Sequence, residues 1–167
     1  PLPGPDPEEP WSRTPFSGSR LGEVEIDLGI VADRLLVGDG LTIANADIGF
    51  AMTAGEARLD LRNGSLATGL VRASAFMELV DGQAIMNGQL VLADVPLEAL
   101  VWRSEGQPVA EGVLTLTAEF DGIGRSPAGL VSALTGRGTL DIGQGVFHFL
   151  GADAFDLVIR LADEGGE

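Results

Sequence analysis

The sequence predicts an α+β domain built on one curved, strongly twisted antiparallel β-sheet, a half-tube of about seven to nine strands with two or three short helices. Apolar and polar residues alternate through most of the chain, which is typical of strands with one dry face. The turns between these runs are too short for crossovers, so neighbouring strands are expected to be antiparallel. The 24 glycines among 167 residues favour turns, bulges and strong twist.

The chain opens with a proline-rich stretch that is set apart from the alternating pattern. Proline lacks a backbone N–H and disfavours regular hydrogen bonding, so residues 1–20 are expected to form a disordered or loosely docked linker. Trp11 and Phe16 are candidates to pin its end. The sheet domain is expected over residues 21–162, and the acidic end, residues 163–167, is expected to be a solvated tail.

The first strands follow directly from this boundary. After Leu21, apolar residues alternate with Glu23, Glu25 and Asp27, and similar runs follow over 41–52 and 57–61. Asn63-Gly64 then predicts a hairpin turn. The three carboxylates indicate a solvated strand face, although the same spacing would also suit a glycosidase acid–base pair or calcium ligands.

The second half of the chain continues the strands and interrupts them with short helices. Strands are expected over 69–79, 84–92 and 112–120, with Asp81-Gly82 as the turn between the first two. The remaining expected elements are helices near 96–102, 127–135 and 153–162, a loop over 105–108, a strand over 139–142, a Gly143-Gln144-Gly145 turn and a strand over 146–149.

One serine has two competing interpretations. Residues 124–128 (GRSPA) approximate the G-x-S-x-G elbow of hydrolases, which would make Ser126 a nucleophile. In that elbow the next residue donates its N–H to the oxyanion hole, and Pro127 has none. The single histidine, His148, is expected on a strand in a structural role. We therefore expect Ser126 to be a helix N-cap and the helix to end at Gly136 or Gly138.

Composition excludes several classes of function. The formal charge of −15 disfavours nucleic-acid binding, which normally requires a basic patch. The chain contains no lysine, so it cannot use a P-loop lysine, a Schiff base or a Ser–Lys dyad. Without cysteine it cannot form a disulfide, a thiolate zinc site or an iron–sulfur cluster. The sequence shows no dinucleotide motif or calcium loop, and we expect neither a metal nor a cofactor.

An apolar surface shared by many strands remains to be explained. It could be an ordinary core beneath the helices, filled by Leu130, Val131 and Leu134, or a groove for acyl chains. In a groove, the lipid-facing residues would occupy alternate positions of successive strands. These candidates are Val24, Ile26, Ile48, Phe50, Leu59, Val71, Met77, Met86 and Leu90.

The order of several short motifs resembles the C-terminal region of AsmA-like proteins. The motifs are Pro10-Trp11-Ser12, residues 30–35 (IVADRL) before a glycine turn, residues 41–48 (LTIANADI), Ala67-Thr68-Gly69, residues 92–100 (LADVPLEAL) and residues 126–140 (SPAGLVSALTGRGTL). Together they span about residues 10–150. The chain departs from the family after Gly145, where Phe147-His148-Phe149 is bulkier than the usual glycine-rich run.

The resemblance implies a Gram-negative periplasmic protein, held in the inner membrane by a segment outside this chain and involved in outer-membrane biogenesis. It implies a relationship to bridge-like lipid-transfer proteins, with phospholipid or another acyl-chain lipid carried along the sheet and no catalytic residues. The alternative is an interaction module that docks an outer-membrane assembly protein by an edge strand or an acidic face, without binding lipid.

Overall fold

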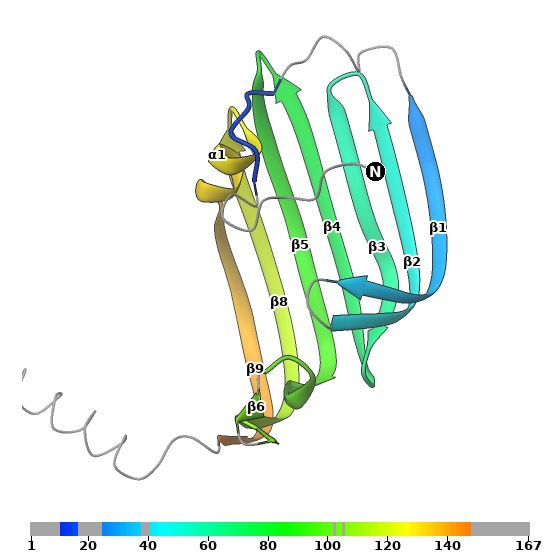
Figure 1. The fold of residues 1–167 in the computed structure, drawn as a ribbon, viewed down its shortest axis with the longest axis vertical. Helices are drawn as coiled ribbons and strands as arrows, with labels where there is room; N and C mark the ends of the chain where they lie inside the picture. The colour runs from blue at the N-terminus through cyan, green and yellow to red at the C-terminus, as the bar shows by residue number, and fades with distance from the viewer. Residues whose placement is uncertain (1–10, 17–24, 38–40, 102, 105, 148–167) are drawn as a thin grey trace, which may run out of the picture.

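A computed structural model of the chain describes residues 11–16, 25–37, 41–101, 103–104 and 106–147. The strands of its main sheet are β1 (Ile26–Val37), β2 (Leu41–Thr53), β3 (Glu56–Leu66), β4 (Gly69–Val80), β5 (Gln83–Pro96), β8 (Ala110–Gly124) and β9 (Thr135–Phe147). These seven strands are antiparallel and ordered β1-β2-β3-β4-β5-β8-β9 (Figure 1). The sheet is an open, curved meander, in agreement with the predicted antiparallel sheet.

Few helical residues accompany this sheet in the described ranges. One α-helix, α1 (Pro127–Ser132), joins β8 to β9, and a 3-10 turn, η1 (Leu97–Ala99), follows β5. The helix expected near 96–102 is therefore only the short η1 turn. The helix expected at 153–162 lies outside the described residues. The loop expected over 105–108 contributes to a small hairpin, in which β6 (Arg103–Ser104) pairs with β7 (Gln107–Pro108).

The hairpin turn expected at Asn63-Gly64 is wrong. Both residues lie inside β3, and the chain turns at Ala67 and Thr68, where Ala67 has a φ of 52°. Gly64 serves close packing instead. A Cβ there would lie 2.6 Å from Cγ2 of Ile43, so the absence of a side chain makes room for that residue. A register shift between Leu61 and Ser65 marks the irregularity in the strand.

Two predictions based on glycines near the end of the sheet are also wrong. Neither Gly136 nor Gly138 ends the helix, because β9 begins at Thr135 and contains both. Gly138 instead permits close contact with β8, since a Cβ there would lie 2.6 Å from the carbonyl oxygen of Thr117. The Gly143-Gln144-Gly145 turn is wrong as well: β9 continues to Phe147, and Gln144 adopts a φ of 52° within it.

The β1–β2 ribbon bends near its hairpin end. Strict alternation would place only one of Ala32 and Leu35, and only one of Ile43 and Ala46, on a given face, yet all four pack with the same hydrophobic cluster. Asn45 has a φ of 51°, and the β2–β3 register shifts beside it. The end of the ribbon consequently folds across the sheet (Figure 1).

The buried core lies at the end of the sheet toward which this ribbon folds. It combines residues of the ribbon, of central strands and of the η1 segment. Its buried members are Ile43, Ala46, Leu66, Val71, Leu92, Val95, Leu97, Ala110 and Leu114. The core is thus formed between one face of the sheet and the segments folded over it.

Candidate functional site

Cross-strand register gathers the apolar residues on one face of the sheet. One row of directly opposed residues runs Ile30, Ile48, Leu61, Ala73, Leu90 and Ala118. The adjacent row on the same face runs Leu28, Phe50, Leu59, Ala75, Gly88 and Phe120. We call this surface the apolar face. Because side chains alternate along each strand, the residues between these rows point to the opposite side, the polar face.

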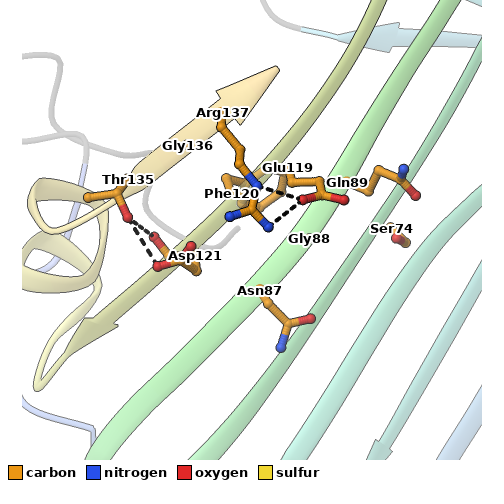
Figure 2. A pocket seen from close by; sticks show the side chains of 10 residues that line it. All are labelled: Ser74, Asn87, Gly88, Gln89, Glu119, Phe120, Asp121, Thr135, Gly136 and Arg137. Carbon is orange, nitrogen blue, oxygen red and sulfur yellow. Dashed lines mark hydrogen bonds and ion pairs between the residues drawn. The ribbon is translucent and has the colours of Figure 1, made fainter. Parts of the chain in front are cut away.

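The polar face is charged and solvated. Its ion pairs join Arg58 to Asp60 at 2.7 Å, Arg62 to Asp47 at 3.0 Å and Arg137 to Glu119 at 2.9 Å. The hydrogen bond from Arg58 to Asp60, together with the carboxylate charge, raises the pKa of the Arg58 guanidinium. A trough of about 520 Å³ lies on this face, and the residues that line it come from β4, β5, β8 and β9. Figure 2 shows their side chains. Ion pairs as exposed as these add little to stability, because water and salt screen them.

The residues predicted to face lipid lie on the apolar face wherever the structure describes them. Ile26, Ile48, Phe50, Met77, Met86 and Leu90 are partly buried there. Leu59 is 50% exposed, whereas Val71 is only 5% exposed and belongs to the buried cluster. Val24 lies outside the described residues. Their contact with lipid stays a prediction.

The described residues leave part of the apolar face uncovered. Leu28 is 49% exposed and Ile30 is 48% exposed on β1, close to the exposure of Leu59 on β3. Neither β1 residue was among the predicted lipid contacts, although the alternation that marked Ile26 continues through both. We call the surface around Leu28, Ile30, Phe50, Leu59 and Met77 the open half, and the part occupied by the buried cluster the roofed half.

An apolar cavity of about 240 Å³ lies where the two halves meet. Ile48, Leu61 and Ala73 contribute to its lining from successive strands of the apolar face. Leu35 and Val37 line it from the folded ribbon. Ile43, Leu59, Ser74, Ala75 and Phe120 also border it, and none of the lining residues, Ser74 included, presents a polar atom to it. A cavity of this character favours hydrocarbon over groups that need hydrogen bonds.

Helix α1 covers the end of the apolar face that lies away from the buried core (Figure 1). Gly122 and Gly124 on β8 let α1 approach closely, since a Cβ at Gly124 would lie 2.7 Å from the carbonyl carbon of Gly129. Leu130 is buried in this contact region, whereas Leu134 is 38% exposed. Helix α1 thus shelters one end of the face and leaves the open half uncovered.

The cap of α1 agrees with the sequence. The Oγ of Ser126 accepts a hydrogen bond from the backbone N–H of Gly129 at 3.1 Å, which confirms the N-cap prediction. The carbonyl oxygen of Ser12 accepts a hydrogen bond from the N–H of Ala128 at 3.0 Å, and Arg125 accepts one from Phe16 at 2.8 Å. Segment 11–16 is therefore docked beside the helix. His148 lies outside the described residues.

The described residues place no charged side chain in the core, and their buried side-chain polar atoms all have hydrogen-bond partners. Among them, no group of three or more His, Cys, Asp or Glu residues could hold a metal ion. Glu25 and Asp27 are exposed. No helix in the same ranges has the length and apolar character that a membrane crossing requires. The arrangement is suited to sheltering apolar matter from water.

The family model described as AsmA family matches residues 5–160, a range that includes all seven strands of the main sheet and α1. No curated protein sequence and no solved structure matches the chain.

Proposed function

Because the chain belongs to the AsmA family, we propose that it is a non-enzymatic segment of an outer-membrane biogenesis protein that shelters phospholipid acyl chains on its apolar face. Family membership indicates a role in outer-membrane or lipid-related biogenesis. One observation supports the finer proposal: an apolar surface at Leu28, Ile30 and Leu59, which the described residues leave uncovered, adjoins a cavity with apolar walls.

Hydrophobic transfer would drive this binding. Each methylene moved from water to an apolar surface contributes about 0.8 kcal/mol, so even a partly covered acyl chain is held appreciably. Strand β4 has 12 residues, which corresponds to about 40 Å at the usual rise per residue. An acyl chain can therefore lie along the strands while its headgroup stays hydrated at the rim.

The proposal includes a cellular location. The protein acts in the periplasm, anchored to the inner membrane, and passes phospholipid or a related acyl-chain lipid along the sheet. AsmA membership and the apolar face support this assignment. The chemistry is passive, since sheltering hydrocarbon requires neither a catalytic group nor a cofactor.

A second candidate function follows from the edge of the sheet. Strand β1 pairs only with β2 in the described part of the chain, and its Val31 side chain is 82% exposed on the polar face. A free edge with exposed apolar residues can accept a strand from another protein. This candidate is an interaction module for an outer-membrane assembly protein, with the apolar face acting only as a core.

Native mass spectrometry of the purified chain with bacterial phospholipid vesicles tests the proposal. Ile30 and Val31 are neighbours on β1 that point to opposite faces, so Ile30→Asp and Val31→Asp form a matched pair. The wild type should carry phospholipid, Ile30→Asp should lose most of it, and Val31→Asp should retain it. A wild type free of lipid contradicts the proposal and favours the interaction module. Equal loss in both variants contradicts the placement of the lipid on the apolar face.

A further inference from the structure

Four residues opposed across β3, β4, β5 and β8 form a row of unequal height on the apolar face. Leu59 faces Ala75, Ala75 faces Gly88, and Gly88 faces Phe120. Going from β3 to β8, the row therefore presents a large side chain, a methyl group, no side chain and an aromatic ring. The low part of the row lies over the two central strands.

The ring of Phe120 occupies the space that Gly88 leaves. A Cβ at Gly88 would lie 2.6 Å from Cε2 of Phe120, so the ring covers this glycine. Phe120 thus extends from β8 over β5, and Ala75 on β4 is the remaining low point between the ring and Leu59. The side chains of this row are therefore lowest at Ala75, between Leu59 and the ring of Phe120, and we call this low point the opening.

The opening joins the two halves of the apolar face. Leu59, Ala75 and Phe120 all border the 240 Å³ cavity, whose other walls include Leu35 and Val37 of the folded ribbon. On the other side of the row, Met77 and Met86 face each other in the open half. A chain lying on the open half and extending along β4 would meet the cavity at Ala75.

We propose that this opening, with Ala75 as its floor and Leu59 and Phe120 as its sides, admits the end of one acyl chain into the cavity. Phe120 is then a specificity-determining residue that limits how much of the chain enters. The inference rests on the proposed function. The occupant is hydrocarbon because the apolar walls offer no partner for the N–H and C=O groups of a peptide.

Two variants change the opening in opposite directions. Ala75→Leu fills the floor of the opening, whereas Phe120→Ala removes one side and uncovers Gly88. Phe76→Ala is the matched control, because Phe76 is also partly buried but opposes Arg58 on the polar face. Circular dichroism of each variant reports whether the sheet is retained.

The test is native mass spectrometry after incubation with mixed vesicles of short-chain and long-chain phosphatidylethanolamine. The wild type should favour the long chains, whose terminal methylenes reach the cavity. Ala75→Leu should lower the long-to-short ratio by roughly fourfold for each methylene kept out, and Phe120→Ala should raise it. Phe76→Ala should match the wild type.

The outcomes separate this inference from the function on which it rests. A wild type that binds neither lipid contradicts the proposed function itself. A wild type that binds lipid, with the same chain-length ratio in folded Ala75→Leu and Phe120→Ala, overturns only the entrance. If Ala75→Leu fails to fold, Phe120→Ala decides alone: a raised ratio supports the entrance, and an unchanged ratio overturns it.

Discussion

The roofed and open halves of the apolar face are built from the same strands but differ in what covers them. On β3, Leu66 in the roofed half is 4% exposed, whereas Leu59 in the open half is 50% exposed. The folded β1–β2 ribbon and the η1 segment pack over the first residue and not over the second. Whether an apolar strand face becomes a core or a binding surface therefore depends on segments outside the alternating pattern.

The largest loss of stability is expected for a substitution in the roofed half, and the matching substitution in the open half should cost much less. Leu66→Ala should lower the free energy of unfolding by about 2–5 kcal/mol, because it removes a buried side chain and leaves a cavity. Leu59→Ala should cost about 1 kcal/mol, since half of its surface is already in water. Urea unfolding followed by circular dichroism measures both. Equal costs would mean that the open half is also covered.

Gly124→Ala probes the contact between β8 and the helix that shelters one end of the apolar face. The added methyl meets the backbone of α1, so the variant should lose about 1–3 kcal/mol of stability. Gly29→Ala on β1 is the control, because nothing lies within 4 Å of its new methyl. That variant should be neutral or gain about 0.5–1 kcal/mol. The midpoint temperature of thermal unfolding should therefore fall in Gly124→Ala, and it should rise or stay unchanged in Gly29→Ala.

Ser126→Ala should have a smaller and local effect. It removes the side-chain acceptor for the N–H of Gly129 and should cost about 1 kcal/mol, whereas Ser126→Asp should retain the cap. Hydrogen exchange should increase in α1 while β3 and β4 stay protected. Increased exchange throughout the sheet would show that α1 supports more of the fold than the end it covers.

The smallest effect is expected on the polar face. Arg137→Ala removes the ion pair with Glu119, but both side chains are largely exposed and the loss should stay below about 1 kcal/mol. Chemical denaturation at low and high salt checks it, with the difference from the wild type shrinking as salt rises. A loss of stability above about 1 kcal/mol that does not change with salt would contradict this expectation, because it would mean that the polar face contributes substantially to folding.

The sequence could predict what depends on local periodicity. Alternation specified the antiparallel sheet, register then placed Ile48, Phe50 and Met77 on one face, and the Ser126-Pro127 pair specified the helix start. These features succeed because each depends on residues adjacent in the chain or on a fixed period of two.

The features that the sequence did not predict depend on contacts between residues that are far apart in the chain. Asn63-Gly64 carries a strong turn signal, yet Gly64 is required inside β3 because Ile43 packs against it. Gly138 lies within β9 beside the backbone of β8. The bend at Asn45, which roofs half of the apolar face, had no distinct signal in the alternating pattern. The same pattern therefore could not separate buried Val71 from half-exposed Leu59 among the candidate lipid contacts.

Photo-crosslinking with a phospholipid that carries a diazirine on its acyl chain tests the central claim most directly. Peptide mapping after irradiation should find the label on Leu28, Phe50, Leu59 and Met77 in the open half. Val31 and Phe76, which lie on the polar face of the same strands β1 and β4, should stay unlabelled. Labelling of the polar face, or equal labelling of both faces, would contradict the assignment of the open half as the lipid-binding surface.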